Sequence, residues 1–387
     1  MGERFPTLVR PPPVDTSKAP IENALELTEL SIIGPAAQRT VPPNFVVHSY
    51  HCFFVLAGDS SVPILYHVER VREGRSFCTR TVQARQRGHA IFTVTCSFVR
   101  EGSGGEEAVS HAVPVPADAL AQTPPDDYED PPFLRRAGDD PFQSFRCKAP
   151  GDGDGEEDDD KKEPTSKRVW QWVRARGKIS EKGGLRAHLS ALAYVSDSYF
   201  IGTVSRIHRL WRYPVGPEDV DKLDPQVREH LERVNEWEGY GTLESLAGRP
   251  EVGMMVSLDH SIYFHNPSKV RADEWMFVEM ESPWAGDGRG VVMQKIYSRD
   301  GTLLATAFQE VSFVFFFFFF FFLFPPFLLP FPSPTLCLFL QPSPFCGWLN
   351  WLTNIARLVG CCTIKAEEEE RGEQVEAMRT PRLGLVV

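Results

Sequence analysis

The sequence predicts an α+β fold, with antiparallel sheet wrapped around a long helix, built as two tandem repeats. Two observations support this prediction: the same landmarks occur twice along the chain, and strand-like runs separate the landmarks in both copies. The second copy also has an amphipathic helix before its strands. A length of 387 residues allows two or three domains on a prior of roughly 100–200 residues each.

The landmarks place the repeats at about residues 21–123 and 165–311. In the first repeat the spacings are 26, 14 and 8 residues between His48-Ser49, Gly74-Arg75, Gly88 and Cys96. In the second repeat they are 28, 13 and 8 residues between His260-Ser261, Gly288-Arg289, Gly301 and Gln309. The two series agree within two residues, which indicates an internal duplication.

Runs rich in β-branched and aromatic residues fill the intervals, with Gly, Pro or Asp at their ends. They cover residues 46–55, 64–71, 76–83 and 90–98, then 256–264, 275–280, 291–297 and 303–311. Gly88 and Gly301 lie between consecutive runs, where a tight hairpin turn needs a residue with positive φ. The runs therefore predict antiparallel strands.

The second repeat begins with a strand-like run at 168–179 and a helix. Apolar residues recur there at helical spacing after a glycine pair: Leu185, Leu189, Leu192 and Val195. One strand, one long helix and four antiparallel strands describe a hotdog fold, so we expect a tandem (double) hotdog. The first repeat offers only residues 31–40 at the equivalent place, with Gly34-Pro35 in the middle. That stretch is too short for a core helix, so we expect the first-repeat helix to be missing.

Acidic residues concentrate in one segment. The formal net charge is −11, and residues 124–163 contribute −8 of it with fourteen acidic and six basic side chains. We interpret 124–164 as an acidic disordered linker. A calcium loop at Asp152, Asp154 and Glu156 is disfavoured, because no flanking helices or twelfth-position Glu complete the ligands. The negative charge argues against a nucleic-acid partner.

Residues 312–387 have an unusual composition. Of the 34 residues from Ser312 to Phe345, thirty are Phe, Leu, Pro or Ser, the only amino acids with all-pyrimidine codons. A translated intronic polypyrimidine tract, and so a gene-model or splicing artefact, explains this set, and we expect the tail to lie outside the fold. A membrane anchor is disfavoured, because the apolar run 311–323 is shorter than the roughly 20 residues of a spanning helix.

The rest of the composition predicts an intracellular protein without cofactor or metal. The chain starts without a long apolar run, so we do not expect a cleaved secretory signal. Its eight cysteines form no CxxC pair and have no His partner at zinc spacing, which favours reduced thiols. His260 and His265 would face opposite sides of a strand, which disfavours a shared metal ion.

Three polar residues of the second repeat are candidates for chemistry. Asp197 lies in the apolar and aromatic end of the predicted helix, where a carboxylate must be paired or used, although a capping role beside neighbouring serines is an alternative. Gln309 interrupts an apolar strand at a position that could face the helix. Strict alternation predicts that Ser257 shares a face with Asp259 and Ser261, and that His260 lies on the other. The first-repeat equivalents of Ser257 and Gln309 are Phe45 and Cys96, so we infer that one copy kept a polar site.

A carboxylate, a hydroxyl and a carboxamide can together orient and deprotonate a water molecule. This chemistry suits direct hydrolysis of an activated acyl bond without a covalent intermediate. A serine hydrolase is disfavoured, because the sequence contains no Gly-x-Ser-x-Gly and residues 102–105 form a loop. The glycine-rich residues 286–290 precede no predicted helix, so a β-turn is favoured over a phosphate loop.

The motifs closely resemble the acyl-CoA thioesterase II family, in particular its fungal members. They are His48-Ser49 with Phe53, Gly74–Phe77 with Arg80–Ala84, Ala193–Asp197, Ser257–Ser261 with Phe264-His265, Glu281–Trp284, Gly288–Gly290 and Gln309-Glu310. The resemblance covers about residues 20–123 and 165–310. It implies a double-hotdog hydrolase of medium- to long-chain fatty acyl-CoA, with Asp197, Ser257 and Gln309 as the residues that activate water. The chain departs from the family at the first-repeat helix and after Glu310.

The resemblance also bears on location and alternatives. Peroxisomal members end in a Ser-Lys-Leu type address, whereas this chain ends at Gly384–Val387, so we expect a peroxisomal location by resemblance and a cytoplasmic one otherwise. Homo-oligomerisation remains open. One alternative is a catalytically inactive acyl-CoA-binding or truncated product of the same family. A dehydratase of the same fold is disfavoured, because no Asp/His pairing on a helix is evident.

Overall fold

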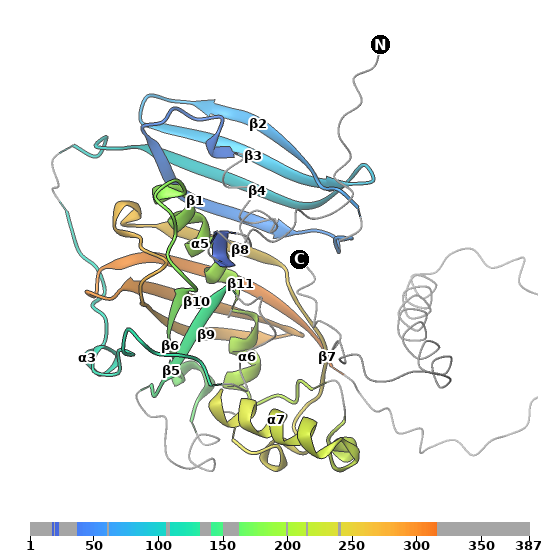
Figure 1. Cartoon of the computed structure of the whole chain (residues 1–387). Helices are drawn as coiled ribbons and strands as arrows, with labels where there is room; N and C mark the ends of the chain where they lie inside the picture. The colour runs from blue at the N-terminus through green and yellow to red at the C-terminus, as the bar shows by residue number, and fades with distance from the viewer. Residues whose placement is uncertain are drawn as a thin grey trace, which may run out of the picture. The chain divides into compact units, whose positions relative to one another are not determined.

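Eleven strands form one antiparallel sheet in the part of the chain that the structure describes (Figure 1). The computed structural model describes residues 18, 20–22, 37–59, 62–105, 109–131, 141–149, 162–198, 200–213, 216–238 and 241–315. The strand order is β2-β3-β4-β1-β8-β11-β10-β9-β6-β5, and β7 pairs with β11 beside this path. All neighbouring strands are antiparallel, as the hairpin turns predict.

The predicted strands are confirmed in both repeats. The first repeat contains β1 (Phe45–Phe54), β2 (Leu65–Glu73), β3 (Phe77–Gln86) and β4 (His89–Arg100). The second contains β6 (Val169–Ala175), β7 (Val252–Ser257), β8 (Asp259–Phe264), β9 (Met276–Gly286), β10 (Arg289–Ser298) and β11 (Leu303–Phe315). A further strand that the patterns did not predict, β5 (Phe142–Cys147), precedes them. Gly88 and Gly301 both have φ of 84°, which the short turns between strands require.

The two repeats join through strands β1 and β8. Their register pairs Ser49 with Tyr263 and Phe53 with Asp259, so the two sheets form one continuous surface. Cys52 Sγ also donates to the carbonyl oxygen of His260 at 3.1 Å. The first repeat therefore supports β8, the strand that pairs with β11 on its other edge.

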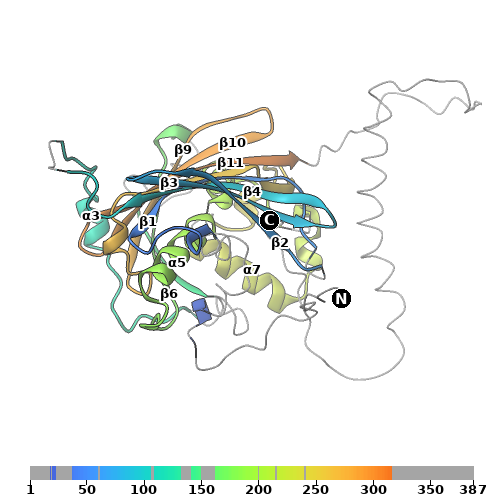
Figure 2. The ribbon, with the colours of Figure 1, turned by 90° about the horizontal axis from the view of Figure 1, so that it is seen from above.

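Helix α5 (Gly184–Ser198) packs on the inner face of this sheet, as Figure 2 shows. Its apolar positions Leu189, Leu192 and Val195 are all buried, which confirms the helix predicted from their spacing. Full burial of each such side chain contributes about 1.5–3 kcal/mol. A shorter helix, α6 (Ile201–Ile207), follows and packs against β9 and β10.

Between α6 and β7, the described residues 208–213, 216–238 and 241–251 form a helical insertion that the sequence patterns did not predict. It contains α7 (Pro225–Trp237), whose N-cap Asp224 accepts a hydrogen bond from the Gln226 amide at 2.8 Å. The insertion has a small core of its own, formed by Trp211, Val220, Leu243 and Leu246. A short helix, α3 (Ala117–Leu120), lies between the repeats.

Two predicted segments contain strand residues that the sequence patterns missed. The segment 124–164 is not wholly a disordered linker, because β5 lies within it and pairs with β6 at the end of the sheet. The residues of β5, Phe142–Cys147, do not alternate strictly between apolar and polar side chains, so their local signal for a strand is weak beside the surrounding acidity. Residues 150–161 lie outside the described part. The sheet also does not end at residue 311, since β11 continues to Phe315 and pairs with β7. The later tail lies outside the described residues.

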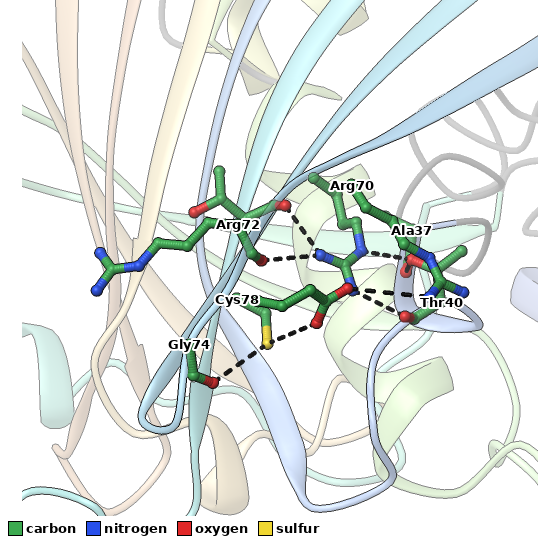
Figure 3. Close-up of polar contacts among 9 residues, drawn as sticks. Ala37, Thr40, Arg70, Arg72, Gly74 and Cys78 are labelled. Carbon is green, nitrogen blue, oxygen red and sulfur yellow. Dashed lines mark hydrogen bonds and ion pairs between the residues drawn. The ribbon is translucent and has the colours of Figure 1, made fainter.

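The buried side chain of Arg80 ties residues 37–40 to the hairpin of β2 and β3. Its guanidinium donates to Thr40 Oγ1 at 2.7 Å, to the Thr40 carbonyl at 2.8 Å and to Glu73 Oε1 at 2.6 Å. It also donates to the carbonyl oxygen of Arg72 at 3.1 Å, and Figure 3 shows Thr40 and Arg72 in this network. These bonds compensate a guanidinium that is 0% exposed. The predicted absence of the first-repeat helix concerns residues 31–40, of which 31–36 lie outside the described residues. Ala37 and Gln38 are helical.

Within the described part of the chain, no helix is long and apolar enough to cross a membrane. Four cysteines of the described part of the chain have buried side chains: Cys52, Cys78, Cys96 and Cys147.

Candidate active site

Asp197 lies in the last turn of α5 and is buried, with 5% of its surface exposed. Its side chain faces the sheet, because its carboxylate accepts a hydrogen bond from Gln309 of β11. Burial disfavours the charged carboxylate and raises the pKa of Asp197 from 3.8 to about 6, while the hydrogen bond from Gln309 acts in the opposite direction. The carboxyl group is therefore poised to exchange a proton near neutral pH.

Gln309 joins the three predicted residues into one network. Its Nε2 donates to Asp197 Oδ1 at 2.7 Å and to Ser257 Oγ at 2.7 Å. Both amide hydrogens are thus used, and the amide orientation follows from the network, because a carboxylate can only accept. Gln309 is 1% exposed, and its buried Oε1 has no hydrogen-bond partner among the residues described. This oxygen is an acceptor available to a water molecule or a substrate.

Ser257 reaches this network because the strand is interrupted after it. β7 ends at Ser257 and β8 begins at Asp259, with Leu258 between them. The predicted grouping of Ser257 with Asp259 is therefore wrong: Ser257 contacts the buried Gln309, whereas Asp259 Oδ1 accepts from the backbone amide of Glu310 at 2.8 Å. An irregularity of one residue shifts the alternation by one position and moves each following side chain to the other face.

The same irregularity places His260 on the inner face, where the sequence patterns did not link it to the site. His260 is 1% exposed, and its Nε2 lies 3.0 Å from Ser196 Oγ. The equivalents of Ser257 and Gln309 in the first repeat, Phe45 and Cys96, are both buried. The first repeat therefore presents an aromatic ring and a thiol where the second presents a hydroxyl and a carboxamide.

The arrangement combines a proton acceptor, an amide and a hydroxyl around one buried point. Asp197 accepts its one described hydrogen bond at Oδ1, which leaves Oδ2 available as a base. Ser257 accepts from Gln309 and keeps its own hydroxyl hydrogen to donate. Among the described residues no group of His, Cys, Asp and Glu could hold a metal ion. The geometry is suited to general-base chemistry on water.

Comparisons with known proteins match both repeats to domains of acyl-CoA thioesterases. The acyl-CoA thioesterase N-terminal domain family matches residues 30–99, and the acyl-CoA thioesterase C-terminal domain family matches residues 116–313. Acyl-coenzyme A thioesterase 8 of Mus musculus is 34% identical over 288 residues, which are 71% of this chain and 75% of that protein.

Two further proteins are similar. Peroxisomal acyl-coenzyme A thioester hydrolase 1 of Saccharomyces cerevisiae is 35% identical over 95 residues, which are 24% of this chain and 27% of that protein. The crystal structure of an acyl-CoA thioesterase II from Mycobacterium marinum has a TM-score of 0.49 and 26% identity, covering 74% of this chain and 88% of that one.

The C-terminal family match begins well before residue 165, in agreement with the place of β5 in the sheet. Both family domains occur in order, and the mouse relative extends over most of both chains. The chain therefore belongs to the acyl-CoA thioesterase II family, the double-hotdog hydrolases of acyl-CoA thioesters.

Proposed function

We propose that this protein hydrolyses medium- to long-chain fatty acyl-CoA to a free fatty acid and CoA, through direct attack of water on the thioester. The observation that supports the mechanism is the pair of 2.7 Å hydrogen bonds through which Gln309 holds Asp197 and Ser257 together. Asp197 and Gln309 are buried and Ser257 is half-buried, and desolvation of such polar groups costs free energy, so their convergence from α5, β11 and β7 favours a role in chemistry.

In the proposed reaction, a water molecule donates one hydrogen bond to Asp197 Oδ2 and the other to Gln309 Oε1. Its lone pair attacks the thioester carbonyl carbon while its proton passes to Asp197. Ser257 Oγ–H donates to the carbonyl oxygen as negative charge develops there. The tetrahedral intermediate then collapses, the carbon–sulfur bond breaks, and Asp197 returns the proton to the CoA sulfur.

The acid–base balance of the site supports this role. A base is most effective when its pKa lies close to the working pH, and burial has raised the pKa of Asp197 to about 6. Nearby His260 remains neutral, because burial lowers its pKa to about 4. The described contacts of the Asp197 carboxylate therefore include no cation that would lower its pKa.

The experiment is a thiol-release assay on the purified full chain with acyl-CoA substrates from short to long chain. We expect release of free CoA that is greatest for medium or long chains and is lost in Asp197→Asn. Circular dichroism verifies that each sample is folded. A folded wild-type protein that binds acyl-CoA without releasing thiol would contradict hydrolysis and establish an acyl-CoA-binding protein instead.

Location and assembly are further proposals. We infer a peroxisomal location from the similarity to the peroxisomal thioester hydrolase of Saccharomyces cerevisiae, and imaging of an amino-terminally tagged chain tests it; a uniform cytosolic signal would contradict it. We also propose a homo-oligomer, because Phe53, Tyr263 and Phe308 are 60%, 38% and 40% exposed on the outer face of the adjacent strands β1, β8 and β11. A monomeric mass in solution would contradict the homo-oligomer.

A further inference from the structure

His260 is a buried titratable side chain that the proposed reaction does not use. It lies on the inner face of β8, and the register of β8 with β11 pairs Ser261 with Phe308. Continued by one residue, this antiparallel register places His260 opposite Gln309. The imidazole thus lies beside the network on the strand that runs between the first repeat and β11.

The hydrogen bonds determine the tautomer of His260. Ser196 Oγ donates to the Ala193 carbonyl at 2.8 Å, and a hydroxyl has only one hydrogen. Ser196 must therefore accept from His260, so Nε2 carries the proton and Nδ1 does not. The ring also contacts Phe200 edge-on, with centroids 5.4 Å apart, which fixes its plane.

Packing alone does not account for a histidine at this position. Its Nδ1 is buried and has no hydrogen-bond partner among the residues that the structure describes. An unpartnered buried nitrogen costs free energy that an apolar side chain of similar size would avoid. The compensating contact is the bond to Ser196, the residue that immediately precedes Asp197.

We propose that His260 is a positioning residue for the water-activating carboxylate. By donating from Nε2 to Ser196, it holds the last turn of α5 against β8, so that Asp197 keeps its contact with Gln309 and directs Oδ2 at the water. This proposal rests on the proposed function. Misplacement of a reacting group by about 1 Å can lower a rate by up to about a hundredfold, which makes such a contact consequential.

The test compares two ways of removing the contact with one way of keeping it. His260→Leu and Ser196→Ala should each lower kcat about tenfold or more, with KM changed less than about twofold. The double variant should be no worse than the more severe single one, because both remove the same contact. In His260→Gln the side-chain amide can donate from nearly the same place, so kcat should recover in part.

The pH profile separates positioning from simple destabilisation. The Gln309 hydrogen bond lowers the pKa of Asp197, so a displaced Asp197 should lose that effect. The acidic limb of the kcat profile should therefore move to higher pH in His260→Leu and Ser196→Ala. Unchanged kcat per folded enzyme and an unmoved limb, with only a lower thermal midpoint, would show a structural role and overturn the proposal.

A matched control is available at the far end of β8. His265, which directly follows β8, is exposed, and its Nε2 lies 2.8 Å from Thr306 Oγ1 of β11. It thus forms a histidine–hydroxyl pair that does not involve α5. His265→Leu should leave kcat and the acidic limb unchanged. Asp197→Asn in the same assay separates the two proposals: wild-type turnover there refutes the proposed mechanism, whereas loss there with unaffected His260→Leu refutes only the positioning role.

Discussion

The substitution Asp197→Asn should abolish turnover and stabilise the folded protein at neutral pH. Asparagine preserves the shape and the oxygen that accepts from Gln309 at 2.7 Å, but it cannot take a proton from water. Loss of a general base typically costs about 10²–10⁴ in rate, or about 3–5 kcal/mol of transition-state stabilisation. We therefore expect kcat to fall by at least about a hundredfold with little change in KM.

The effect on stability follows from the pKa of the carboxyl group. Burial raises it from 3.8 to about 6, a shift of about two units, so ionised Asp197 lowers the free energy of unfolding by about 3 kcal/mol. The folded state binds the proton more tightly than the unfolded state. The wild-type protein therefore carries no penalty below about pH 4, loses stability as the pH rises to about 6, and has the full penalty above it. Asparagine carries no such charge.

Chemical denaturation followed by circular dichroism at about pH 5 and pH 8 measures this difference. The advantage of Asp197→Asn over the wild type should be larger at the higher pH. Asp300→Asn is the control of opposite sign, because hydrogen bonds from Ser298 and Thr302 lower the pKa of the exposed Asp300. Retained kcat in Asp197→Asn, or a stability difference that does not change with pH, would refute the reasoning.

Three further predictions concern the site and its support. For the wild type, kcat should rise with pH through about 6 as Asp197 ionises, and a profile flat between about pH 5 and 7 would exclude it as the base. Ser257→Thr should retain most activity in the thiol-release assay while Ser257→Ala loses about tenfold; equal activity of the two would remove the hydroxyl from the mechanism. Glu279→Ala should lower the free energy of unfolding by about 2–4 kcal/mol in urea titrations, because it deprives Lys295 Nζ, at 2.6 Å, and Trp170 Nε1, at 2.9 Å, of their acceptor; no loss would show that the pair contributes nothing.

Local patterns predicted most of the fold because each element carries its own signal. The eight strand-like runs of the two blocks correspond to strands, and the helix over Leu185–Val195 corresponds to α5. The patterns failed where a strong signal masked a weaker one. The acidity of 124–163 hid β5, and the pyrimidine-type composition after Ser312 hid the last residues of β11. Pairing with β6 and β7 orders these segments, and pairing partners are not adjacent in sequence.

The candidate site was predictable in its members but not in its geometry. Asp197 and Gln309 stood out as polar residues in apolar surroundings, which is a property of the sequence. The face on which Ser257 lies depends on the break at Leu258, because one extra residue reverses the alternation of a strand. For the same reason strict alternation places His260 on the face opposite Ser257, although both side chains lie on the same face of the sheet as Gln309.

The sequence by itself determined the duplication, most of the strands, helix α5 and the three polar residues, because periodicity and landmark spacing are local properties of the chain. Only the tertiary structure decided that β1 and β8 join the repeats into one sheet, that Gln309 bonds both Asp197 and Ser257, and that His260 contacts Ser196. Gln309 lies 112 positions from Asp197 and 52 from Ser257, and His260 lies 64 positions from Ser196. Strand register and tertiary packing bring such residues together, and a local sequence pattern specifies neither of them.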